Sequence, residues 1–489
     1  MRLDDDLKYF EEPEFKEILA KYERARSLGT SIYMDADELT DVAEYYAMVL
    51  HDKERSDEAV GLALQLHPDA VDPQIFRARQ VMQGGDIDGA RMICDAIDDQ
   101  RHREVIFLRG ELLLREGKNS EALQYLMQEG ERILEERDYF LFDSANIFMD
   151  YQDSSSALQL AEELESIAPQ WFKTWELMAD VQLSLEHFDQ ALGYIEKMLD
   201  TDPFYVDGWN WRAEAYSGLN DMEKAIESTD FALAVAPTDE RALQLKAWSL
   251  LQKGNLTEAH KLYEQLIEIN PDNELHYLYD SYCMLDAGDI EAAYQLIQRA
   301  ELMSEGNSPE QAAIYEQYAL VLCAKHDLEG ALNYIDKVEL RQLDIKEEKM
   351  DYDLFRARVF AECDNFEGAM AYIHVSCIKE GHEYYHSYFK GAQMLFETGY
   401  TDTAMEMFQE ILNVVDAKDL YALCYPYLAA CYHEIGDTAN VLDYLRKAID
   451  AKSENLQEVM APIFNEGVAP TDYYDYYYYQ VYGCWPNTR

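Results

Sequence analysis

The sequence is poor in the residues that interrupt helices. Its 489 residues include only 12 prolines and 22 glycines, which favours long regular helices. No apolar run approaches the roughly 18 residues of a membrane-spanning helix. The first residues, MRLDDDLKYFEEPEF, lack the basic and apolar regions of a signal peptide. We therefore expect a helical protein with neither a membrane anchor nor an export signal.

Positive charge is also scarce. There are 41 Lys and Arg residues against 96 Asp and Glu residues, a formal net charge of -55. Nucleic acids and anionic membranes are themselves negative, so this balance disfavours both as partners. It favours a basic protein partner. It is equally compatible with acidity that only keeps a large protein soluble.

Paired cysteines and cofactor motifs are missing. The eight cysteines are scattered and none forms a C-x-x-C pair, which is typical of reduced thiols in the cytoplasm. We find no Walker loop and no G-x-G-x-x-G segment after a strand. The sequence therefore predicts a cytoplasmic protein without a cofactor.

A period of 34 residues dominates the middle of the chain. The segment WELMADVQLSLEHFDQALGYIEKMLDTDP, from Trp175, aligns with WNWRAEAYSGLNDMEKAIESTDFALAVAP, from Trp209. The prolines at positions 169, 203, 237 and 271 keep the same spacing. Such self-similarity is the signature of a repeat array.

Each unit has one small residue and a second one twelve positions later. The first positions are Ala47, Ala78, Gly110, Ala145, Ala179, Ala213, Ala247, Ser281, Ala319, Ala357, Ala392 and Ala429. The second positions are Ala59, Ala90, Ala122, Ala157, Ala191, Ala225, Ala259, Ala293, Ala331, Ala369, Ala404 and Val441. Small side chains at this spacing indicate two closely crossing helices. Glycines between them, such as Gly117 and Gly254, predict a left-handed turn.

The pattern resembles the tetratricopeptide repeat family, of a bacterial cytosolic type, with about twelve repeats over roughly residues 40 to 450. The resemblance implies an all-α fold, a right-handed superhelical solenoid of antiparallel helix hairpins. It also implies a non-catalytic scaffold or adaptor that binds another protein. Neither a cofactor nor a metal is expected.

Departures from the period suggest four segments. We expect an N-terminal capping helix and acidic turn at 1–38, and eight units at 39–304 with a regular period from about 138. Four units with longer connections should occupy 305–451. A capping helix and a Tyr-rich tail should occupy 452–489, the tail covering the apolar end of the array or docking on a second molecule. The first three units look short, with alanine spacings of 31 and 32.

The partner site follows from the resemblance. In the family, the positions three before and one after the first small residue line a concave groove that holds a peptide or helix. Here these positions are Glu176, Asp180, Asn210, Glu214, Gln244, Trp248, Leu278 and Tyr282. An acidic end followed by an aromatic and apolar end fits a basic segment with an apolar anchor. Alternatively, the acids are simply solvated. The acids disfavour a clamp for a peptide's terminal carboxylate.

Two other functions stay open. HEYYH, at 382–386, has the spacing of a zinc metallohydrolase. The repeat register predicts that the helix begins near Tyr384, which leaves His382 outside it. Glu406, whose spacing from His386 matches that of a third zinc ligand, is predicted to point outward from its helix. We therefore expect no metal or catalytic site there. The second alternative is a self-assembling structural array; the oligomeric state is not predicted.

Overall fold

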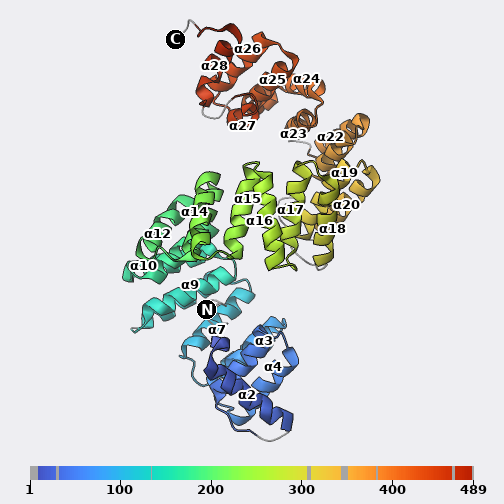
Figure 1. The fold of residues 1–489 in the computed structure, drawn as a ribbon. Coiled ribbons are helices and arrows are strands. Elements are labelled where there is room, and N and C mark those ends of the chain that lie inside the picture. Colours follow the sequence, from blue (N-terminus) through green and yellow to red (C-terminus); the bar gives the residue numbers. More distant parts are fainter. Residues whose placement is uncertain are drawn as a thin grey trace. The chain divides into compact units, whose positions relative to one another are not determined.

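The computed structural model describes residues 9–28, 32–133, 135–304, 310–342, 351–380, 384–464 and 468–486 (Figure 1). Over these ranges the secondary structure is helical, with no strand. The chain divides into two compact units, Met1–Ser249 (unit 1) and Leu250–Arg489 (unit 2).

From Pro13 onward, unit 1 consists of one helix followed by helix hairpins. Its helices are α2 (Pro13–Leu28), α3 (Ala36–Met48), α4 (Lys53–Leu66), α5 (Val71–Gln83), α6 (Ile87–Ala96), α7 (Arg103–Arg115), α8 (Asn119–Arg132), α9 (Arg137–Asp150), α10 (Ser154–Ile167), α11 (Phe172–Ser184), α12 (Phe188–Thr201), α13 (Val206–Gly218) and α14 (Met222–Val235). Helix α15 (Glu240–Gln252) carries the boundary between the units.

Unit 2 continues the pattern and ends in shorter elements. These are α16 (Leu256–Ile269), α17 (Glu274–Asp286), α18 (Ile290–Met303), α19 (Gln311–Ala324), α20 (Leu328–Gln342), α21 (Tyr352–Glu362), α22 (Phe366–Glu380), α23 (Tyr384–Glu397), α24 (Thr401–Leu412), η2 (Val415–Leu420), α25 (Tyr421–Ile435), α26 (Thr438–Asp450), α27 (Leu456–Met460), η3 (Pro470–Asp472) and α28 (Tyr473–Tyr482).

Helices pair in the order that the sequence predicts. In unit 1 the packed hairpins run from α3–α4 to α13–α14, and in unit 2 from α17–α18 to α25–α26. The hairpins bury small residues at their crossings, as at Ala179 and Ala191 or Ala319 and Ala331. Gly110 needs its lack of a side chain, because a Cβ there would lie 2.9 Å from Leu126 Cδ1. The all-α hairpin architecture predicted from the sequence is confirmed.

A left-handed residue ends the first helix of each predicted repeat. These residues, with φ between 51° and 89°, are His51, Gly85, Gly117, Gln152, Glu186, Asn220, Gly254, Gly288, His326, Asp364, Gly399 and Gly436. Each immediately precedes the residue at the N-cap position of the second helix, and many of those N-caps are aspartates that accept a backbone N–H bond, as Asp221 and Asp289 do. The turn glycines Gly117 and Gly254, noted from the sequence, are among them, and the structure adds turns without glycine.

The first hairpin departs from the predicted register. We expected Ala47 and Ala59 at the crossing of α3 and α4. The structure places Ala43 and Ser56 there, both fully buried, and the Ser56 hydroxyl donates a 2.8 Å hydrogen bond to the Ala43 carbonyl oxygen. Ala59 is also buried, but Ala47 is only half-buried. The crossing therefore lies about one helical turn earlier than predicted.

A longer turn causes the shift. The backbone N–H of Asp52 donates to the carbonyl oxygen of Tyr46, six residues back, whereas later turns close over five. With Ser56 as the second small residue, the spacing to Ala90 is the regular 34. Pro68, twelve residues after Ser56, is the sequence signal that supports this register. The first repeat is thus not short.

Both ends of the array are covered. Near the N-terminus, Phe15 and Tyr22 of α2 are buried in a cluster with Leu39 and Tyr46 of α3. Near the C-terminus, α28 packs on α26. There the Tyr473 ring stacks on Phe464, with ring centroids 4.1 Å apart. Two of the tail's tyrosines, Tyr473 and Tyr477, are buried in this way.

Candidate functional site

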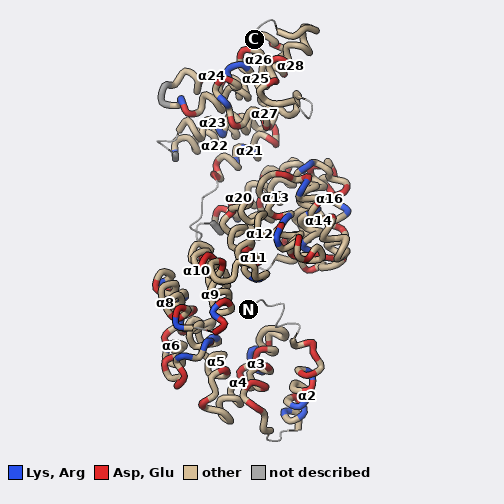
Figure 2. The backbone as a smooth tube through the Cα atoms, turned by 90° about the vertical axis from the view of Figure 1, so that its left-hand side faces the viewer, with Lys and Arg blue, Asp and Glu red and all other residues tan. Residues whose placement is uncertain are grey.

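The predicted partner site lies on the first helices of the hairpins. In unit 1, α7, α9, α11 and α13 contact one another in that order, and in unit 2, α17, α19, α21, α23 and α25 do so. We define the first-helix face as the positions three before and one after the first small residue of these helices and of α15. Residues four apart project from the same side of a helix. Over the whole chain, 96 Asp and Glu residues outnumber 41 Lys and Arg residues, and both kinds are marked along the backbone in Figure 2.

Two carboxylates lie one helical turn apart on α11. Glu176 and Asp180 are both half-buried. The hydroxyl of Tyr205, the N-cap residue of α13, donates a 2.7 Å hydrogen bond to Glu176 Oε1. A phenol holds the carboxylate in place without adding positive charge. This part of the face therefore combines negative charge with a fixed carboxylate orientation.

Glu214 on α13 is paired within unit 1. Its Oε2 lies 2.6 Å from an Nη atom of Arg241, at the start of α15. Both side chains are about half exposed, so the pair contributes little to stability. The guanidinium nevertheless offsets the Glu214 charge, so this position is less negative than the sequence predicted.

Asn210 and Leu278 lie inside the protein. Asn210 is 1% exposed and donates a 2.9 Å bond from Nδ2 to Asp239 Oδ1. Leu278 is also 1% exposed, and it belongs to the core cluster of α17 to α21. Their positions on the first helices are as predicted, but neither side chain offers surface to a ligand. Both act in packing between neighbouring helices.

The remaining predicted residues keep partial exposure. Gln244 and Trp248 on α15 are half-buried, as is Tyr282 on α17. Burial raises the pKa of Tyr282 to about 12, and the nearby Glu316 carboxylate adds to the shift. These side chains offer amphipathic surface of the kind that partners contact. Gln244 and Trp248 belong to unit 1 and Tyr282 to unit 2, so they represent two separate parts of the face.

Glu316 on α19 is a face residue that the sequence reasoning missed. It stands three residues before Ala319, so the same rule identifies it in a unit beyond the regular stretch. Burial raises the pKa of its carboxyl group. Its charge also raises the pKa of Tyr352, after the larger effect of burial. In unit 2, the Glu316 carboxylate thus lies near Tyr282 and Tyr352.

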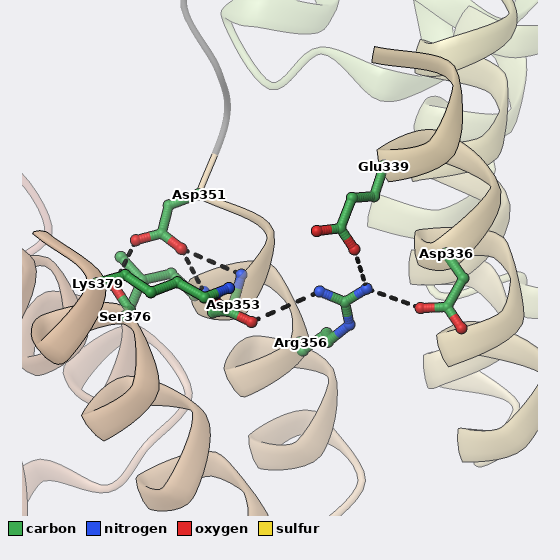
Figure 3. Close-up of polar contacts among 8 residues, drawn as sticks. Asp336, Glu339, Asp351, Asp353, Arg356, Ser376 and Lys379 are labelled. Carbon is green, nitrogen blue, oxygen red and sulfur yellow. Dashed lines mark hydrogen bonds and ion pairs between the residues drawn. The ribbon is translucent and has the colours of Figure 1, made fainter. Parts of the chain in front are cut away.

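An ion network links two hairpins of unit 2. Arg356, on α21, has a side chain only 11% exposed. Its Nη2 lies 2.7 Å from Asp336 Oδ1 and 2.5 Å from Glu339 Oε2, both on α20, as Figure 3 shows. Its Nη1 lies 3.6 Å from Asp353 Oδ1, and Asp353 is also paired with Lys379 of α22. The network joins α20, α21 and α22, with Arg356 largely buried and Lys379 about 60% exposed, and each of the two cations is paired with carboxylates. We therefore interpret it as structural.

The HEYYH segment is only partly described. His382 and Glu383 lie outside the described residues, so the geometry of the motif is untested. Helix α23 is described from Tyr384 onward, and His386 lies in the first turn of that described part. His386 Nε2 lies 3.1 Å from Asp419 Oδ2, and Glu406 is exposed, as expected. Among the described residues, no group of three or more His, Cys, Asp or Glu side chains is placed to hold a metal ion.

No helix in the described part of the chain combines the length and apolar character that a membrane crossing requires.

Comparison with known proteins identifies the repeat. Two tetratricopeptide repeat models match residues 177–240 and 240–273. A TPR repeat-containing protein of Methanocaldococcus jannaschii is 23% identical over 350 residues, which cover 61% of this chain and 59% of that protein. The chain thus matches about three fifths of the length of this curated relative.

Solved structures with a similar fold are more distant. A tetratricopeptide repeat protein from Parabacteroides merdae is 17% identical, with a TM-score of 0.42, over 55% of this chain and 98% of its own. The APC/C hetero-tetramer Cut9-Hcn1 is 13% identical, with a TM-score of 0.37, over 88% of this chain and 76% of its own. PilW, a type IV pilus biogenesis factor, is 17% identical, with a TM-score of 0.39, over 43% and 96%.

Proposed function

Because this chain is a tetratricopeptide repeat protein, we propose that it is a non-catalytic scaffold that binds a basic segment of another protein on the first-helix face of unit 1. One observation carries the proposal. Glu176 and Asp180 place two half-buried carboxylates one helical turn apart on α11. The net charge of -55 would draw a basic partner toward the chain. A cytoplasmic location and a bacterial type remain predictions.

The roles proposed for the other face residues differ. A partner lysine or arginine would contact Glu176 and Asp180, and an apolar side chain of the partner would contact Trp248. Glu214 would contribute only where the partner's cation displaces Arg241, since the two are already paired. In unit 2, Tyr282 and Glu316 form a second, separate part of the proposed face. Asn210 and Leu278 are left out because they are buried.

The experiment is a binding titration with a defined probe. A labelled ten-residue peptide of alternating lysine and leucine is titrated with the protein at low and moderate salt, and fluorescence anisotropy gives Kd. The double variant Glu176→Lys, Asp180→Lys should weaken binding by tenfold or more, because two attractive contacts become repulsive. Binding by the wild type should also weaken as salt rises.

A matched control separates local contact from overall charge. Asp189→Lys with Glu227→Lys makes the same charge change at exposed positions on the second helices α12 and α14. It should leave Kd within about twofold of wild type. Equal losses in the two double variants would mean that only the net charge attracts the peptide. A stable oligomer that ignores the peptide would instead favour a self-assembling array.

A further inference from the structure

Two cysteines meet between neighbouring repeats of unit 2. Cys323 lies near the end of α19, and Cys363 directly follows α21, forty residues later. Their Sγ atoms are 4.0 Å apart, and Cys363 Sγ is 3.9 Å from the carbonyl oxygen of Cys323. Both are free thiols. First helices one repeat apart pack side by side, which brings equivalent ends of α19 and α21 together.

The pair lies beside the contact between α20 and α21. Arg356 ties the start of α21 to α20 through Asp336 and Glu339. The thiols stand at the opposite end of α21, against α19. A disulfide bond there would link α21 to α19 at the end of α21 opposite Arg356.

We propose that Cys323 and Cys363 form a reversible disulfide bond by exchange with a small-molecule disulfide. The Cys363 thiolate attacks one sulfur of that disulfide, forms a mixed disulfide and releases one small thiolate. The Cys323 thiolate then attacks the Cys363 sulfur and expels the second small thiolate. Two protein thiols are oxidised to one disulfide, and the small-molecule disulfide is reduced to two thiols, so electrons and atoms balance.

Exposure sets the order of the two steps. Cys363 is half-buried and can be reached by a small molecule, whereas Cys323 is only 3% exposed. Bringing the sulfurs from 4.0 Å to bonding distance requires an approach of about 2 Å, which a small shift of the helix ends can supply. Burial raises the pKa of both thiols, and Glu362 and Asp364 raise that of Cys363 further. The exchange should therefore be slow at neutral pH and faster in mildly alkaline solution.

Oxidation of the two cysteines would restrict movement between α19 and α21. The disulfide would fix α19 to α21 across a closed loop of about forty residues. Constraining a loop of that size restricts the unfolded chain, so the oxidised protein should melt at a higher temperature. Reduction by a dithiol should restore the original melting point.

The test uses the full-length chain carrying Cys484→Ser, because Cys484 is the exposed cysteine of the described residues and would react on its own. The folded protein is incubated with oxidised glutathione at mildly alkaline pH, its remaining thiols are alkylated, and it is digested without reduction. Mass spectrometry should find the peptide of Cys323 linked to that of Cys363. The melting point should rise and then return after treatment with dithiothreitol.

Two further variants keep the test decisive. In the Cys484→Ser background, Cys363→Ser should abolish the linked peptide and the melting shift. Cys424→Ser, which removes a buried cysteine elsewhere, should leave both unchanged. Circular dichroism before oxidation confirms that each variant folds. The proposal is wrong if the folded protein keeps Cys323 as a free thiol while Cys363 is free or carries glutathione, or if linked peptides appear only after denaturation.

Discussion

The Ser56 hydroxyl donates a hydrogen bond to the Ala43 carbonyl oxygen where α3 crosses α4. Ser281 makes the same kind of bond in unit 2, donating to the Ala293 carbonyl oxygen across α17 and α18 at 3.2 Å. A serine at a small-residue position thus links the two helices of a hairpin. The bond also marks where the helices cross, which identifies the register of the hairpin.

We expect Ser56→Leu to lower the free energy of unfolding by about 1–3 kcal/mol, because a larger side chain does not fit at the crossing. Ala47→Leu should change it by less than about 0.5 kcal/mol, since Ala47 is only half-buried. Urea denaturation of both variants measures the difference. If Ala47→Leu were the more destabilising of the two variants, the register first predicted from the sequence would be correct.

Replacing a non-glycine turn residue by glycine should stabilise the array. Glu186 has φ of 58°, a left-handed conformation that costs a residue with a Cβ about 1 kcal/mol. Glu186→Gly should therefore raise the free energy of unfolding by roughly 0.5 kcal/mol after the entropy cost of glycine. The converse change, Gly288→Ala at φ 82°, should lower it by about 1 kcal/mol. Thermal melts that show no change in either variant would contradict these turn geometries.

Removing the central arginine of the ion network should weaken unit 2. Arg356→Met leaves Asp353, whose side chain is 7% exposed, with one cationic partner fewer. We expect a loss of about 1–3 kcal/mol in the free energy of unfolding. Arg358→Met is the matched control, because its partners Glu362 and Glu397 lie 3.8 Å and 3.5 Å away and all three side chains are about 40% exposed. That variant should lose less than about 1 kcal/mol.

Glu316 predicts a pH dependence of stability. Burial raises its pKa above the ordinary value of 4.5. A raised carboxyl pKa means that the folded state holds its proton more tightly than the unfolded state. The protonated Glu316 carboxyl group thus adds to the free energy of unfolding. This stabilisation is fully present below pH 4.5 and is lost as pH rises through the folded-state pKa. Glu316→Gln should therefore match wild type at pH 4 and be more stable at neutral pH.

Denaturation across this pH range measures the effect. Glu406→Gln, at an exposed position on α24, is the control and should follow the wild-type curve. If Glu316→Gln were less stable than wild type at neutral pH, the ionised carboxylate would be making a favourable interaction in the folded state. In that case Glu316 would be a structural residue.

Much of the fold could be predicted because the repeat signal is local. The two small residues of a hairpin and the turn between them lie within about twelve positions, so a single segment specifies its own pairing. The prediction was wrong for the first hairpin, where one extra turn residue moves the crossing and the alignment of alanines hides it.

The sequence by itself determined the all-α hairpins and their order, because helix pairing depends on spacing within one repeat. The positions of the first-helix face came from the resemblance to the repeat family. Only the tertiary structure decided what each face residue does there. Tyr205 reaches Glu176 from 29 residues away, and Arg241 reaches Glu214 from 27. Burial removed Asn210 and Leu278 from the surface. The meeting of Cys323 with Cys363 likewise spans one repeat. Contacts between repeats depend on how hairpins stack, and the spacing within a hairpin does not encode which side chains then touch.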